Sequence, residues 1–271
     1  MERLGYSSLD EKLAERFHTT VEVLKQLNPN GRPAGMPAAA GGSPTPGTSA
    51  TASPNASATP RPTSSPTSSP SASASPTPSA SGTGFTPQPG PASYFQAGQQ
   101  IRVPNLGADR IAPGAIKELS WQQTLATLGV GTEQPKVDKI VVSKSENTLK
   151  AYQGDKLVAM FTVSSGSAEF PLPLGEWDIV GIAHNPPYSY SPEVLSGGSE
   201  SGESYQLPPG PNGPVGVVWI DLSKEHYGIH GTPEPQTIGR AQSDGCVRLT
   251  NWDAARLAQM VDSSTKVEFV A

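Results

Sequence analysis

The sequence predicts a mainly β fold with a few helices for residues 137–271, preceded by a small α+β N-terminal part and a long disordered stretch. Two observations lead to this prediction. Runs rich in β-branched and alternating apolar residues recur through 137–271, with turn residues between them. Residues 31–93 are almost wholly Pro, Ser, Thr, Ala and Gly. The 271 residues therefore contain two ordered parts of different character, divided by a biased segment.

Residues 7–30 predict two short helices. Ser8 is followed three residues later by Glu11, which is the spacing of a capping box, and Thr19 with Glu22 repeats this pattern. Apolar residues follow at helical spacing: Leu9, Leu13, Ala14, Phe17, Val23, Leu24 and Leu27. The Asn-Pro-Asn-Gly sequence at 28–31 ends the second helix.

The low-complexity segment, residues 31–93, predicts disorder. Its charged residues are Arg32 and Arg61, and its large apolar residues are Met36 and Phe85. Such a chain cannot bury enough apolar surface to offset the entropy of ordering. Composition favours a spacer and an insertion of no consequence equally. Residues 107–136 are expected to be a connector with a short helix near 115–128.

The strand predictions come from short runs bounded by turn residues. We expect a turn and short strand at 95–105, then strands at 139–142, 148–152, 156–163, 176–180, 215–220 and 265–270. A helix is predicted at 252–261, capped by Thr250 or Asn251. Residues 184–214 are rich in Pro, Gly and Ser and too long for a simple connection, which is typical of a lid or binding loop.

The charge and composition disfavour several classes of protein. The net charge is −5 and basic residues do not cluster, which argues against nucleic-acid binding. No apolar stretch approaches the ~18–20 residues of a membrane span. We expect neither a metal nor an organic cofactor, because His, Cys and carboxylate residues do not occur at metal-ligand spacing.

The candidate chemistry involves the single cysteine, Cys246, and His230, sixteen positions before it. A cysteine nucleophile needs a nearby base, and histidine is the natural one near neutral pH. Gly245 lets the backbone approach a substrate closely, and N–H groups around Cys246 can hold an oxyanion. A lone thiol is more often a small buried hydrophobe, and the spacing alone leaves both interpretations open.

Four separated motifs resemble a known family. The segment Tyr227-Gly-Ile-His-Gly-Thr232, followed by Ser243-Asp-Gly-Cys-Val-Arg248, is similar to the paired signature of the YkuD-type L,D-transpeptidase domain. Residues 142–149 and the Pro-Leu-Gly-Glu-Trp sequence at 173–177 resemble its opening hairpin and turn. The resemblance covers 137–271 and implies a catalytic domain of β-sandwich or barrel-like form.

The resemblance also implies roles in the site. Cys246 would be the nucleophile and His230 its base, oriented by the main-chain carbonyl of Gly231. The N–H groups of Gly245 and Cys246 would form the oxyanion hole, while Ser243, Tyr227 and Arg248 would line the site. For Arg248, a contact to a substrate carboxylate and a scaffold salt bridge are equally favoured.

The other histidines receive no catalytic role. Many family members have a histidine where this chain has Asp244, so a second active-site histidine is not assigned. We interpret His226, His184 and His18 as structural or surface residues.

The implied reaction is a peptidoglycan transpeptidation through a Cys246 thioester. Terminal D-alanine leaves a tetrapeptide stem, and an amine then takes the acyl group. With water as acceptor the enzyme would be an L,D-carboxypeptidase; a third possibility is a non-catalytic peptidoglycan-binding scaffold. Carbapenems inhibit the family and would acylate Cys246. Peptidoglycan chemistry implies export to the periplasm or cell wall, although Met1–Tyr6 lacks the pattern of a signal peptide.

The N-terminal part is similar to a LysM-type module, a class that binds N-acetylglucosamine chains. The resemblance covers 5–30 and 94–106, with 31–93 as an insertion. It implies glycan strands as a further partner and predicts that the ends of the insertion lie close together. A purely structural helical pair is the alternative.

Overall fold

The computed structural model describes residues 4–35, 93–106, 110–190, 205–241, 243 and 245–271. Most of the predicted disordered segment and the middle of the predicted lid therefore lie outside the described residues. The helices are α1 (Leu9–Arg16), α2 (Val21–Leu27), η1 (Pro29–Gly31), α3 (Leu119–Leu128), η2 (Pro235–Thr237) and α5 (Asn251–Met260). The strands are β1 (Lys139–Ser143), β2 (Thr148–Gln153), β3 (Lys156–Thr162), β4 (Ser164–Ser165), β5 (Gly175–His184), β6 (Tyr188–Tyr190), β7 (Tyr205–Leu207), β8 (Val218–Leu222), β9 (Gly228–His230), β10 (Val247–Arg248) and β11 (Lys266–Val270).

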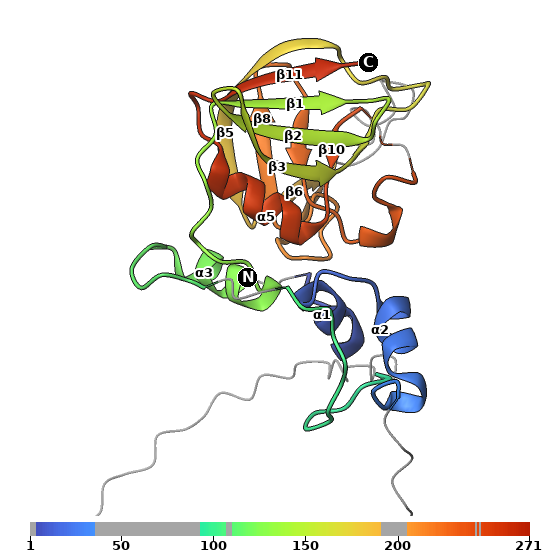
Figure 1. The fold of residues 1–271 in the computed structure, drawn as a ribbon. Coiled ribbons are helices and arrows are strands. Elements are labelled where there is room, and N and C mark those ends of the chain that lie inside the picture. Colours follow the sequence, from blue (N-terminus) through green and yellow to red (C-terminus); the bar gives the residue numbers. More distant parts are fainter. Residues whose placement is uncertain (1–3, 36–92, 107–109, 191–204, 242, 244) are drawn as a thin grey trace, which may run out of the picture. The chain divides into compact units, whose positions relative to one another are not determined.

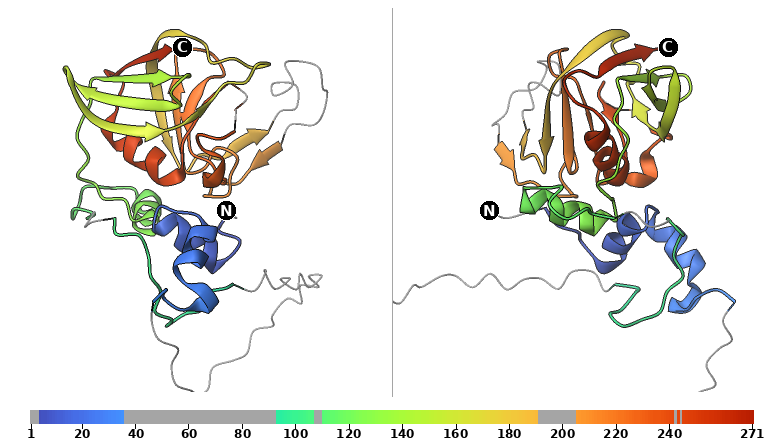
Figure 2. Two further views of the ribbon diagram at one scale, coloured as in Figure 1. Left: turned by 45° about the vertical axis from the view of Figure 1, so that its right-hand side comes forward. Right: turned by 60° about the vertical axis from the view of Figure 1, so that its left-hand side comes forward.

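The main sheet is a nearly closed barrel. Its nine strands run in the order β3-β2-β1-β11-β5-β8-β9-β10-β4, so β3 and β4 are its two edges. Only Val163 separates these two strands in the chain. Because one residue spans at most about 3.6 Å, the two edges must meet and the sheet must curl round on itself. The curvature and the position of α5 beside the strands are visible in two orientations (Figure 1 and Figure 2). The predicted mainly β fold is confirmed.

The core joins the inner face of this sheet to α3 and α5. Trp121, Leu125 and Leu128 of α3 are fully or almost fully buried, and they belong to one cluster with Leu257 of α5 and Ile220 of β8. The α5 helix begins as predicted, because the Thr250 hydroxyl accepts the Asp253 N–H at 3.3 Å. The α3 helix ends at Gly129, which adopts the left-handed conformation.

The predicted boundaries fail where turns intervene. The strand expected at 215–220 begins at Val218, because Gly213–Gly216 form a turn in which the Gly216 N–H bonds to the Gly213 carbonyl at 2.9 Å. The α3 helix begins at Leu119 rather than near residue 115. The second N-terminal helix is capped by Thr20, whose hydroxyl accepts the Val23 N–H, and not by Thr19.

Residues 93–106 pack against α1 and α2 without forming a strand, which corrects the strand expected at 95–105. Phe95 is buried with Ala14 and Leu24. The Asn28 carboxamide takes the place of a ladder partner: its nitrogen donates to the Arg102 carbonyl at 2.8 Å and its oxygen accepts the Arg102 N–H at 2.6 Å. A single side chain therefore satisfies both backbone groups of one residue.

The two sides of the low-complexity segment lie together. The Tyr94 hydroxyl donates to the Asn28 carbonyl at 2.9 Å and accepts the Gly31 N–H at 2.7 Å. Tyr94 therefore joins residues that lie on either side of this segment in the chain. No helix among the described residues is long and apolar enough to cross a membrane.

Two leucines of α3 test the contribution of the core. Leu125 is fully buried, whereas Leu119 is 71% exposed on the same helix. We expect Leu125→Ala to lower the free energy of unfolding by about 2–5 kcal/mol, because it leaves a cavity in a packed interior. Leu119→Ala should change it by less than about 0.5 kcal/mol. Urea denaturation of both variants measures the difference, and equal effects would contradict the core described above.

Candidate active site

The pairing of β9 with β10 brings the two sequence motifs together. The strands are parallel, with Val247 opposite Ile229 and Arg248 opposite His230, and the Leu249 N–H donates to the His230 carbonyl at 2.8 Å. Val247 and Ile229 belong to the core. Since side chains alternate along a strand, His230 and Arg248 leave the sheet on the opposite face. Cys246 directly precedes β10, the strand that pairs with β9, and β9 ends at His230.

His230 is held in one orientation and one tautomer. Its Nδ1 lies 2.7 Å from the Gly231 carbonyl oxygen, which can only accept a hydrogen bond, so Nδ1 carries the proton. The Nε2 lone pair is therefore available as a base. The ring also stacks on Trp219, its partner on β8, with 5.4 Å between ring centroids.

The electrostatic surroundings keep this imidazole neutral. Burial lowers the pKa of His230 to about 4; the hydrogen bond to Gly231 opposes this shift, and the positive charge of Arg248 adds to it. Near neutral pH the ring is therefore uncharged, which is the form required of a proton acceptor.

Cys246 is partly exposed, unlike a thiol that serves only as core packing. Its Sγ lies 3.7 Å from the main-chain oxygen of His226. Gly245, directly before it, has φ +97°, and a Cβ there would lie 2.8 Å from Cε1 of Tyr227. Glycine is required at 245 both by its backbone conformation and by the Tyr227 ring packed against it.

Ser243 fixes the backbone beside the cysteine. This buried side chain accepts the Gly166 N–H at 2.7 Å and donates a short hydrogen bond to the Cys246 carbonyl. Gly166 directly follows β4, so the hydroxyl links two distant segments. Asp244 lies outside the part of the chain that the structure describes.

The remaining histidines have contacts that fit structural roles. His226 is exposed, and its main-chain oxygen lies 3.7 Å from the Cys246 Sγ. His184 stacks on Trp121 with 4.2 Å between centroids. His18 stacks on Trp252 at 5.4 Å, and its Nε2 lies 2.8 Å from the Leu128 carbonyl.

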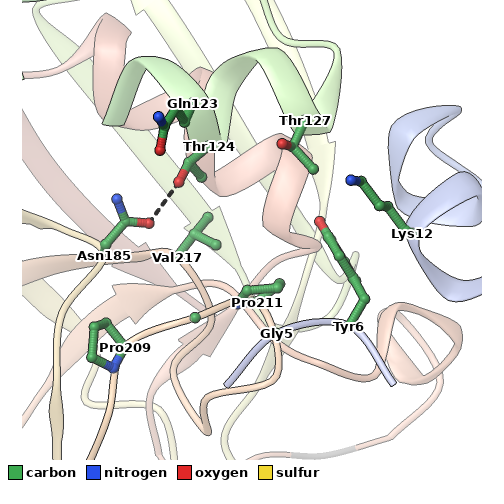
Figure 3. A pocket seen from close by; sticks show the side chains of 11 residues that line it. Gly5, Tyr6, Lys12, Gln123, Thr124, Thr127, Asn185, Pro209, Pro211 and Val217 are labelled. Carbon is green, nitrogen blue, oxygen red and sulfur yellow. Dashed lines mark hydrogen bonds between the residues drawn. The ribbon is translucent and has the colours of Figure 1, made fainter. Parts of the chain in front are cut away.

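Two pockets lie apart from the thiol. One, of about 230 Å³, is bounded by Tyr6, helix α3 and residues 209–217 (Figure 3). The other, of about 290 Å³, is lined by Gly166, the partner of Ser243, together with Lys144 and Arg240. Its two cationic side chains suit an anionic group.

Sequence patterns did not indicate several of these contacts. Trp219 lies within a predicted strand, but no motif marked it as the stacking partner of His230. Gly166 lies outside every motif, although it anchors Ser243. Both contacts depend on pairing between distant strands, which the local sequence does not contain.

A buried, neutral histidine on the strand next to a partly exposed cysteine is an arrangement used by cysteine acyltransferases and hydrolases. Comparison with known proteins narrows this class. Residues 138–269 match the YkuD family, described as the L,D-transpeptidase catalytic domain. The YkuD protein of Bacillus licheniformis, an L,D-transpeptidase by name, is 33% identical over 150 residues, which is 55% of this chain and 76% of that protein.

Two further proteins are similar to this chain. The YkuD protein of Bacillus subtilis is 32% identical over 128 residues, covering 47% of this chain and 63% of its own length. L,D-transpeptidase 3 from Mycobacterium tuberculosis, solved with a faropenem-derived adduct, has a TM-score of 0.41 at 19% identity and covers 52% of this chain and 62% of that one. The chain therefore belongs to the YkuD family of L,D-transpeptidases, as the sequence motifs predict.

The buried imidazole predicts how stability depends on pH. An unfolded histidine titrates near 6.5, whereas His230 does so near 4 when folded. Between these values the unfolded chain binds more protons, so this group should lower the stability as pH falls from 6.5 to 4, by on the order of 3 kcal/mol. NMR titration of the His230 ring and urea unfolding of wild type and His230→Gln across this range measure it. A ring that titrates near 6.5 would contradict the buried environment.

Proposed function

We propose that this L,D-transpeptidase acts on peptidoglycan stem peptides through a Cys246 thioester, with His230 as the base. The observation that carries the proposal is the hydrogen bond from His230 Nδ1 to the Gly231 carbonyl. It leaves the neutral Nε2 as the proton acceptor, and the strand that ends at His230 pairs with the strand that directly follows Cys246.

The reaction proceeds in two halves. Nε2 takes the thiol proton, and the sulfur attacks the carbonyl of the third stem residue at its bond to the terminal D-alanine. The N–H groups of Gly245 and Cys246 stabilise the resulting oxyanion. The C–N bond breaks, His230 gives its proton to the departing amine, and D-alanine leaves. An acceptor amine then attacks the thioester and loses a proton to His230. The C–S bond breaks, and His230 returns this proton to the sulfur of Cys246.

Supporting roles are assigned from the contacts. Ser243 holds the Cys246 carbonyl and so sets the direction of the N–H groups around it. Tyr227 packs behind Gly245 and favours the conformation that the oxyanion hole requires. Burial is the main cause of the lowered pKa of His230, and the charge of Arg248 adds to it. A contact from Arg248 to a substrate carboxylate is the alternative role for this residue.

The identity of the acceptor distinguishes the remaining functions. An amine acceptor gives a cross-link, whereas water gives an L,D-carboxypeptidase. A non-catalytic scaffold is disfavoured because the partly exposed thiol and the buried neutral base are both present.

The N-terminal part is proposed to be a discontinuous LysM-like module of residues 5–30 and 94–106 that binds glycan strands. Support comes from Asn28, which joins α2 to Arg102, and from Asp10, which accepts the N–H groups of Tyr94 and Phe95 at 2.7 and 2.9 Å. Binding both glycan and stem requires export to the periplasm or cell wall.

A defined muropeptide tests the reaction. Wild type incubated with a disaccharide tetrapeptide should release D-alanine and form a cross-linked dimer. Mass spectrometry measures both products over time. His230→Gln should slow release by about 10²–10⁴-fold, because general base catalysis is lost. His184→Gln is the matched control and should retain the rate. Tripeptide without dimer would identify water as the acceptor.

Carbapenem labelling tests the nucleophile separately. Imipenem should add one acyl group to wild type in intact-mass spectrometry, because Cys246 is the only cysteine in the chain. Cys246→Ala should remain unlabelled under the same conditions. Full labelling of that variant would remove Cys246 from the mechanism.

A further inference from the structure

A buried acid on the first helix has no role in the mechanism above. Glu15 of α1 is only 3% exposed. Its two oxygens accept from neutral groups, Asn251 Nδ2 at 2.8 Å and the Tyr6 hydroxyl at 3.0 Å. Burying a carboxyl group is costly unless its hydrogen bonds are satisfied. The position of Glu15 therefore depends on these two partners.

Asn251, the first residue of α5, is fully buried and uses its whole carboxamide. Besides Glu15, its nitrogen bonds to the Pro211 carbonyl at 3.1 Å, and its oxygen accepts the Val217 N–H at 3.2 Å. The amide thus connects α1 with the segment that leads into β8. Both Pro211 and Val217 also line the pocket beside Tyr6 (Figure 3).

The same amide packs directly on Gly231. A Cβ at Gly231 or at Gly216 would overlap the Asn251 oxygen, so neither position has room for a side chain. The Gly231 carbonyl accepts the Nδ1 proton of His230 at 2.7 Å. A shift of the Asn251 amide toward Gly231 would press on the peptide that orients the imidazole, and a shift away would remove its packing support.

We propose that Glu15 is a positioning residue for His230, acting through Asn251 and Gly231. The N-terminal helix thereby becomes part of the catalytic arrangement. The inference rests on the proposed function of His230. Two further contacts lie near this link: His18, which follows α1, stacks on Trp252 of α5, and Arg16 of α1 donates to the Ala126 carbonyl of α3.

The protonation of Glu15 suits this role. Burial raises its pKa to about 7; the hydrogen bonds from Asn251 and Tyr6 oppose this rise, and Glu11 adds to it. The neutral carboxyl group still presents a carbonyl oxygen to Asn251. Glutamine has the same shape and also presents a carbonyl oxygen, so Glu15→Gln is the conservative variant.

The experiment compares three variants of the full chain with wild type. Asp10 is the matched control, because it is 6% exposed on the same helix but bonds to Tyr94 and Phe95 instead. Imipenem acylation rates, Tm and the ¹⁵N shifts of the His230 ring are measured for Glu15→Ala, Glu15→Gln and Asp10→Ala. We expect acylation to slow about tenfold in Glu15→Ala and to stay within about twofold in the other two, because misplacing a base is costly.

The outcomes separate positioning from stability. Asp10→Ala should lower Tm at least as much as Glu15→Ala, yet leave the His230 shifts unchanged. Acylation of Glu15→Ala at the wild-type rate would overturn the inference, as would equal slowing in Asp10→Ala. If wild type is not acylated, the proposed function fails. In that case the ¹⁵N shifts of the His230 ring are the remaining test of the positioning role. An unaltered Nδ1–H signal in Glu15→Ala overturns it.

Discussion

The hydrogen bond between His230 Nδ1 and the Gly231 carbonyl is the constraint on which the site depends. A side-chain hydrogen-bond partner could be charged and could change rotamer. A main-chain carbonyl has no rotamers, so its position depends only on how the backbone around it is held. The fold holds that backbone from several directions: β9 pairs with β8 on one side and β10 on the other, and Asn251 packs on Gly231 itself. The orientation of His230, the proposed base, therefore depends on the sheet.

Closure of the sheet supports the backbone around Cys246. Because Val163 alone separates β3 from β4, the chain passes from one edge of the sheet to the other within a single residue. Gly166 then lies where its N–H reaches Ser243, and Ser243 holds the carbonyl of Cys246. A barrel that failed to close would leave the backbone around the thiol without this support. The geometry around the proposed nucleophile, Cys246, and the topology of the fold are thus linked.

Local patterns predicted much of the fold. Strands β1, β2, β3, β5 and β11 and helix α5 follow from alternation, turn residues and the Thr250 cap. The motifs around Cys246 and His230 predicted the family and the candidate pair. The short strands β9 and β10 were missed, since two or three residues give no periodicity and their pairing joins distant segments. The absence of a strand at 95–105 reflects the Asn28 carboxamide, which supplies the hydrogen bonds of a missing neighbour.

The burial of Glu15 could not be read from α1 alone, because its partner Asn251 lies 236 positions away. Glu15 and Asn251 each supply a hydrogen-bond partner that the other, being buried, requires. Without an acceptor from α1, one N–H of a fully buried carboxamide would lack that partner, a loss of about 1–3 kcal/mol for a buried donor. With it, the Asn251 side chain makes three hydrogen bonds, one to α1 and two to the segment that leads into β8. A buried network whose hydrogen bonds are all satisfied favours one arrangement of its side chains over the alternatives. That selectivity is what a catalytic histidine oriented by a backbone carbonyl requires.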